Sequence, residues 1–209
     1  YALYSNTTGN QNTAHGLWAL GKNTTGSLNA AVGSYALFCT TTGADNTAVG
    51  VNALKLSTTA IRNTAVGMNT MYSNTTGCEN NGFGRQALYS NLTGCGNTAL
   101  GFNTLYANST GSHNTATGQA ALQSNTTASY NAAVGGCALC ANTTGAYNTA
   151  SGYSALQKNT TGNYNTGVGN FAGCLNTTGH CNVAVGYGAR TSADGLNNTV
   201  AIGYGVHAA

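Results

Sequence analysis

A strictly periodic motif runs along almost the whole chain. Glycine recurs twelve times, at every seventeenth position, and asparagine stands four residues ahead of eleven of these glycines. The consensus is N-T-A-V-G-x-x-A-L-x-x-N-T-T-G-x-x, and no copy contains an insertion. Globular folds tolerate changes in loop length, whereas stacked coils lose their register at any slip, so the strict period predicts a solenoid. The glycines are Gly16, Gly33, Gly50, Gly67, Gly84, Gly101, Gly118, Gly135, Gly152, Gly169, Gly186 and Gly203.

The repeat unit is too short for a pair of helices, and its fixed Gly, Asn and Thr residues disfavour helix. It suits two or three short strands joined by tight turns. We therefore predict an all-β fold, a parallel β-solenoid (β-roll or β-helix) of about twelve coils. Stacking at ~4.8 Å per coil would make this segment roughly 55–60 Å long.

The composition excludes several classes of protein. Only 4% of the 209 residues are charged, the net charge is +3 and 41% are hydrophobic, a balance that does not favour disorder. Six scattered Lys and Arg residues form no basic patch, so no nucleic-acid partner is expected. No apolar run approaches the ~20 residues of a membrane span. The chain lacks an initial Met and a signal peptide, and we expect it to be a segment of a longer, processed polypeptide.

Alternation along N-T-A-V-G assigns the side chains to two faces. Thr47 and Val49 share one face, and Ala48 and Gly50 share the other. We expect the Val position to form one core ladder and the Leu position, represented by Leu54, to form a second. The face restricted to Ala and Gly predicts close packing against the opposite wall or another chain. Because each buried Leu or Val contributes only ~1.5–3 kcal/mol, stability must accumulate along the stack or from oligomerisation.

Asn12 and its equivalents mark turns, since Asn tolerates positive φ and its side chain bonds to nearby backbone. Stacked Asn side chains can also pass amide hydrogen bonds from coil to coil. We interpret this row as structural and not as a ligand-binding site.

The last two units, "CNVAVGYGARTSADG" at 181–195 and "NNTVAIGYGVHA" at 197–208, resemble the head repeats of trimeric autotransporter adhesins, whose motif is N-x-V-A-I-G-x-x-A-x-A. The longer units that precede them also resemble repeats of bacterial and phage-type fibre proteins. The adhesin resemblance implies a left-handed parallel β-roll and a homotrimer. It covers 182–208 well and 1–181 more loosely, so we divide the chain into a regular solenoid, 1–181, and adhesin-head-like terminal coils of the same solenoid, 182–209.

One position of the repeat carries the N-glycosylation motif Asn-x-Ser/Thr. A row of glycans there would indicate an extracellular surface. The alternative is that N-T-T-G is only a turn whose Thr rows bond from coil to coil. The candidates are Asn6, Asn23, Asn74, Asn91, Asn108, Asn125, Asn142, Asn159, Asn176 and Asn197.

The seven cysteines contain two suggestive pairs. Cys78 and Cys95 lie one repeat apart, so their Cα atoms would be ~4.8 Å apart in adjacent coils, within the range of a disulfide. Cys137 and Cys140 form a C-x-x-C spacing that resembles a redox or zinc half-site. No second pair or His stands at ligand spacing, so we interpret these two as small buried thiols.

The sequence contains few residues that could act in catalysis. The acids Asp45, Glu79 and Asp194 are scattered, and the four histidines fall at different repeat positions. We therefore expect no enzyme, no metal and no cofactor. Stacked tyrosines, such as Tyr130, could stiffen the coils or bind sugar rings.

These observations lead to one expected function and two alternatives. We expect an extracellular or cell-surface structural fibre, a self-assembling rigid rod whose partner is itself, as a homotrimer or a filament. One alternative is an adhesin or receptor-binding fibre that recognises cell-surface glycans. The other is an ice-binding solenoid that uses threonine ladders such as Thr7-Thr8 and Thr24-Thr25, although adjacent threonines point to opposite faces of a strand.

Overall fold

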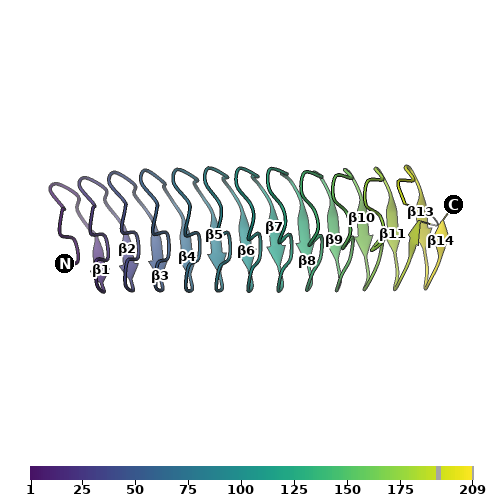
Figure 1. Ribbon diagram of the computed structural model, residues 1–209, viewed down its shortest axis with the longest axis horizontal. Helices are drawn as coiled ribbons and strands as arrows, with labels where there is room; N and C mark the ends of the chain where they lie inside the picture. Colours follow the sequence, from purple (N-terminus) through teal and green to yellow (C-terminus); the bar gives the residue numbers. More distant parts are fainter. Residues whose placement is uncertain (192–193, 209) are drawn as a thin grey trace.

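The computed structural model describes residues 1–191 and 194–208 as a single stack of coils with the two ends of the chain at opposite ends of the rod (Figure 1). Every neighbouring pair of strands is parallel, and the register advances by one full repeat from strand to strand, as in the pairing of Ala48 with Ala65. The predicted parallel β-solenoid is confirmed. The described residues contain no helix, and hence none that is long and apolar enough to cross a membrane.

One long sheet takes a three-residue strand from each coil. Its strands follow the order β1 to β11 and then β13, so chain order and spatial order agree. A second sheet of two strands, β12 and β14, exists only in the last coils. The strands are β1 Thr13–His15, β2 Ala30–Val32, β3 Thr47–Val49, β4 Thr64–Val66, β5 Asn81–Phe83, β6 Thr98–Leu100, β7 Thr115–Thr117, β8 Ala132–Val134, β9 Thr149–Ser151, β10 Thr166–Val168, β11 Val183–Val185, β12 Arg190–Thr191, β13 Val200–Ile202 and β14 His207–Ala208.

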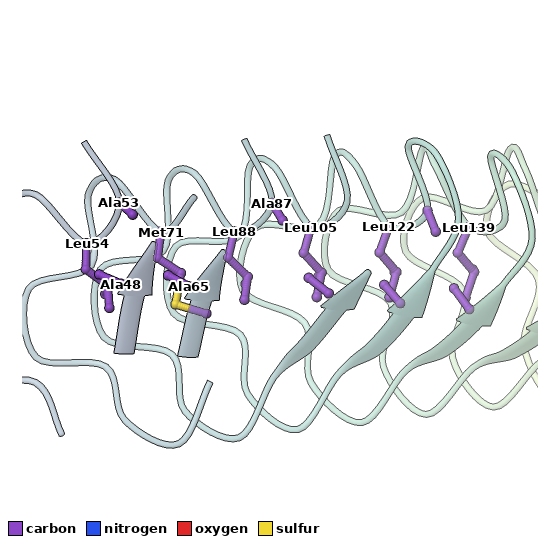
Figure 2. Close-up of a cluster of buried hydrophobic side chains, with 14 of the residues drawn as sticks. Ala48, Ala53, Leu54, Ala65, Met71, Ala87, Leu88, Leu105, Leu122 and Leu139 are labelled. Carbon is purple, nitrogen blue, oxygen red and sulfur yellow. The ribbon is translucent and has the colours of Figure 1, made fainter. Parts of the chain in front are cut away.

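The core is a narrow double row of small and medium side chains. The middle residue of strands β2 to β11 and of β13, such as Ala65 in β4, is buried and faces the interior. Opposite it lies the Leu ladder, in which Leu88, Leu105 and Leu122 are fully buried and follow one another along the rod (Figure 2). The predicted Leu ladder is confirmed, and the wall against which the Ala face packs belongs to the same chain.

The prediction that the Val position forms a second core ladder is wrong. Val49 is 38% exposed and Val134 is 48% exposed, because the third residue of each strand points outward. The reason is the small width of the interior. At Gly82 a Cβ atom would lie 2.8 Å from Thr70 Cγ2 and 2.9 Å from Met71 Cε, and every other coil carries only Ala or Gly on that wall.

Met71 and Gly82 provide a test of this fit. Met71 replaces the usual Leu, and Gly82 replaces the Ala that faces it. We expect Gly82→Ala alone to lower the free energy of unfolding by about 1–3 kcal/mol through overpacking. In the double variant M71L/G82A the loss should disappear. Two coils further along, Leu105 and Ala116 occupy the equivalent positions and pack beside Thr104, the equivalent of Thr70. Denaturant titration of the two single variants and the double variant measures the coupling, and purely additive effects would contradict this account.

The turns hold non-glycine residues in the left-handed region at three positions of most coils. Examples are Ala120 with φ 57°, Leu122 with φ 51° and Tyr130 with φ 61°. Such a conformation costs about 1–2 kcal/mol per residue. The N–H groups of these three residues donate to carbonyls of adjacent coils, at 3.0, 3.0 and 3.1 Å. Stacking therefore sustains the turns, and a single coil would lack these bonds.

The core changes in the last coils. The Leu ladder ends at Leu156, after which Gly173 and Arg190 take its position. A separate small cluster of buried alanines continues the interior there, formed by Ala172, Ala184, Ala189 and Ala201.

Candidate functional site

The described part of the chain holds no cluster of three or more His, Cys, Asp or Glu residues that could bind a metal ion. Its single ion pair, between Arg62 Nη1 and Glu79 Oε1 at 2.6 Å, lies in solvent. The remaining candidates for a functional site are the rows formed by side chains at the same repeat position in successive coils. Besides the Leu ladder and the alanine wall, two rows of asparagine lie inside the rod, and the remaining rows lie on its surface.

The first internal row is the asparagine ladder that begins at Asn12. Asn80 is representative: its Nδ2 donates to Asn63 Oδ1 at 3.1 Å and to Gly94 O at 2.8 Å. Its Oδ1 accepts from the backbone N and the Nδ2 of Asn97, at 3.0 and 3.1 Å. Nearly every side-chain hydrogen-bonding group is used between coils, which supports a structural role for this row.

The second internal row contains most of the glycosylation candidates. At Asn108, Nδ2 donates to Asn91 Oδ1 at 2.8 Å and to Gly111 O at 2.9 Å. A glycan on this nitrogen would have to replace buried hydrogen bonds and cross the wall of the coil, so the folded coil has no room for one. The same burial holds for Asn23, Asn74, Asn91, Asn125, Asn142, Asn159 and Asn176. Asn6 is only partly buried, and Asn197 is exposed.

This second ladder is interrupted where Thr40 and Ser57 replace asparagine. The Thr40 Oγ1, Ser57 Oγ and Asn23 Oδ1 atoms are buried and have no hydrogen-bond partner among the described residues. Beyond the gap the ladder resumes and continues to Asn176. The gap is thus a local weakness of the rod.

Closing the gap with Thr40→Asn and Ser57→Asn is expected to stabilise the rod. The two new amides would give Asn23 Oδ1 its donor and connect the ladder to Asn74. We expect the double variant to gain about 1–3 kcal/mol, more than the sum of the single variants, because only the double variant has an unbroken chain of amide bonds. In Thr40→Asn alone the new Oδ1 meets no amide donor at residue 57, and in Ser57→Asn alone the new Nδ2 meets no amide acceptor at residue 40. Urea denaturation provides the measurement. Thr42→Asn, at an exposed position, is the control and should change stability by less than about 0.5 kcal/mol.

Cys78 and Cys95 are neighbours, as their spacing predicted. The Cys78 backbone N lies 3.1 Å from Cys95 Sγ, and both residues are partly exposed free thiols. A hydrogen bond with the Cys95 thiol, together with burial, raises the pKa of Cys78 to about 11. The disulfide between them stays a prediction.

Exposed apolar side chains form a row on the outside of the long sheet, which we call the outer apolar stripe. It consists of the third residue of many strands and of the residue two positions further along the chain. Because these positions recur in every coil, the stripe follows the axis of the rod, and it is interrupted where they are Thr117 and Gln119. Its members are Leu17, Val32, Val49, Val51, Met68, Phe83, Leu100, Phe102, Val134, Tyr153, Val168, Tyr187, Ile202 and Tyr204.

Two threonine rows lie side by side, and only one presents free hydroxyls. The first Thr of each N-T-T-G is used internally: Thr24 Oγ1 donates to Thr41 O at 3.0 Å. The second is exposed, and its hydroxyl bonds to none of the residues that the structure describes. This second row is threonine in eleven successive coils, at Thr8, Thr25, Thr42, Thr59, Thr76, Thr93, Thr110, Thr127, Thr144, Thr161 and Thr178. The sequence places adjacent threonines on opposite faces, but it does not show which of the two rows is exposed.

The tyrosine row forms a continuous stack. Ring centroids of Tyr130 and Tyr147 are 5.1 Å apart, and those of Tyr147 and Tyr164 are 5.0 Å apart, with nearly parallel planes. His113 extends the stack at 5.2 Å from Tyr130. The ring faces therefore cover one another, and edges and hydroxyls face the solvent. This geometry favours stiffening of the coils over stacking with sugar rings.

The site geometry thus consists of internal amide ladders and surfaces that repeat with the coil. No protein-family model matches this chain, and no curated protein or solved structure shows significant similarity to it.

Proposed function

We propose that this chain is a segment of an extracellular structural fibre or surface filament, a rigid rod that assembles with copies of itself. The observation that carries the proposal is the outer apolar stripe. Large exposed apolar patches are uncommon on soluble monomers, and they mark interaction surfaces.

A second copy of the chain is the partner that fits the stripe. A surface that recurs once per coil is matched along its length by another surface with the same repeat. The chain has only six basic and three acidic residues, so little charge repulsion opposes close approach of two rods. Burial of the stripe would contribute roughly 25 cal/mol per Å² of apolar surface. The proposed assembly is a homotrimer or a filament.

Rigidity supports the structural role. Backbone bonds, the two asparagine ladders and the Leu ladder all run along the axis, and most coils contribute to all of them. The extracellular or cell-surface location is proposed from the resemblance of the terminal coils to adhesin heads.

Light scattering and sedimentation of the purified chain test the proposal. We expect the wild-type protein to associate, and Val49→Lys with Leu100→Lys to give monomers, because both changes place charge on the stripe. Thr25→Lys, on the exposed threonine row, should still associate. All variants should keep the same circular dichroism. A wild-type monomer at high concentration, or stripe variants that assemble normally, would contradict self-assembly.

Two alternatives have separate tests. An adhesin would have to recognise glycans through tyrosine edges and hydroxyls, and a glycan array with Tyr147→Ala as the comparison measures this. An ice-binding role is favoured by the uniform row of free threonine hydroxyls. It requires thermal hysteresis that Thr110→Lys abolishes.

A further inference from the structure

A pair of thiols in the middle of the rod has no role in the ladders or in the outer apolar stripe. Cys137 and Cys140 lie at opposite ends of one turn, and the Cys140 N–H donates to Cys137 O at 3.3 Å. The two Sγ atoms are 2.6 Å apart, closer than sulfur atoms that merely pack together. The spacing thus brings the sulfurs within reach of a covalent bond.

Beside Cys137 the surface is hollowed. A cavity of about 170 Å³ is lined by Gln119, Ala120, Gly136, Cys137 and Tyr153. The cavity exists because Gly136 has no side chain. At the same repeat position the two adjacent coils carry Gln119 and Tyr153. A small molecule that enters the cavity meets Cys137.

The two thiols differ in environment. Cys137 lines the cavity, whereas burial, followed by the hydrogen bond with Cys137, raises the pKa of Cys140 to about 12. Gln157 of the next coil approaches both sulfurs. Its side-chain Nε2 lies 3.8 Å from Cys137 Sγ, and its backbone O lies 3.9 Å from Cys140 Sγ. Cys137 is therefore the thiol placed to react first, and Cys140 is placed to react second.

We propose that Cys137 and Cys140 form a redox site that closes a reversible disulfide by exchange with a small-molecule disulfide whose reacting end reaches Cys137 through the cavity. The Cys137 thiolate attacks one sulfur of the small disulfide, whose S–S bond breaks and whose other half leaves as a thiol after taking up a proton. Cys140 then loses its proton and attacks the Cys137 sulfur, which releases the second half as a thiol. Two protein thiols are oxidised and one small disulfide is reduced to two thiols.

Redox chemistry suits this pair better than metal binding. The described residues offer no third His, Cys, Asp or Glu to complete a metal site around the two sulfurs. The turn also contains left-handed residues at Cys137, φ 57°, and Leu139, φ 52°. A disulfide across this turn would fix both, so oxidation should strengthen this coil.

Oxidised glutathione is the probe for the full-length chain. In the wild-type protein we expect Cys137 and Cys140 to lose two hydrogens and to keep no glutathione. Because Leu139 lies between them, proteolysis after leucine should give two fragments that stay joined until a reductant is added. The denaturation midpoint should rise on oxidation and fall again with dithiothreitol.

Three variants locate the steps. Cys140→Ser should trap one glutathione on Cys137, and Cys137→Ser should leave Cys140 unmodified over the same time. Gly136→Leu fills the cavity, keeps both cysteines in the chain and should slow the reaction severalfold. Cys174 is the internal control, since it occupies the coil position of Cys140 with Phe171 in place of the first cysteine, and it should remain a free thiol.

Two results would overturn the proposal. One is a wild-type pair that stays reduced while the protein is folded. The other is a Cys140 that reacts as fast in the Cys137→Ser variant as Cys137 does in the Cys140→Ser variant. Circular dichroism verifies that each variant is folded. If a cysteine variant does not fold, Gly136→Leu still tests the proposal, because it retains both cysteines.

Discussion

Gly135→Ala is expected to be one of the most damaging single substitutions in the rod, with a loss of about 3–5 kcal/mol in the free energy of unfolding. Gly135 has φ +132°, a conformation that is nearly restricted to glycine. A Cβ atom there would lie 2.6 Å from the Gly152 carbonyl carbon and closer still to its oxygen. Both atoms belong to the backbone of the next coil, so relief requires the two coils to separate.

The adjacent residue provides the control. Gly136 lacks the positive φ, and its added Cβ would meet only the Tyr153 ring, at an ordinary 3.4 Å. We expect Gly136→Ala to change the denaturation midpoint little. Guanidinium titration of the two variants separates the backbone constraint from a general intolerance of side chains at this corner. Equal effects of the two changes would refute the steric argument.

The second large effect is expected at Asn80. Removal of its side chain in Asn80→Ala leaves the buried Asn97 N–H without an acceptor and takes one donor from Gly94 O. An unpaired buried group costs about 1–3 kcal/mol, and lost packing adds to it, so we expect a total loss of about 2–4 kcal/mol.

Asn81, the next residue, is the matched control because it is exposed on β5 and the equivalent positions of β2 and β8 are alanines. Asn81→Ala should alter stability by less than about 0.5 kcal/mol. Amide hydrogen exchange gives a second readout, since Asn80→Ala should raise the exchange rate of the Asn97 amide specifically. Unchanged protection of that amide would show that the ladder bond is dispensable.

The sequence was sufficient to predict the solenoid, its period and the Leu ladder, because each follows from strict repetition and from alternation along the chain. Alternation shows only that Val49 and Ala48 lie on opposite faces, and it does not show which face is inside. Hydrophobicity suggested Val, but the width of the interior decides the matter, and that width is a property of the closed coil. An alanine wall opposite a leucine ladder leaves no volume for valine.

The candidate sites were harder to predict for a similar reason. A motif such as Asn108-x-Thr110 states the chemistry of a side chain but not its burial, which depends on where the chain turns. The contact between Cys78 and Cys95 was predictable, since the period alone places them in adjacent coils. The close approach of Cys137 and Cys140 depends on turns with left-handed residues, which nothing in the composition of those residues indicates.

The insertion-free repeat has a mechanical consequence. If the rod were stretched from its ends, coils would detach one after another, and each would release one repeat of the same length. An extended chain spans about 3.3–3.6 Å per residue, so each rupture should lengthen the molecule by roughly 50 Å once the lost coil height is subtracted. A force–extension trace would then show a series of evenly spaced peaks. Such a rod would dissipate load in uniform small steps.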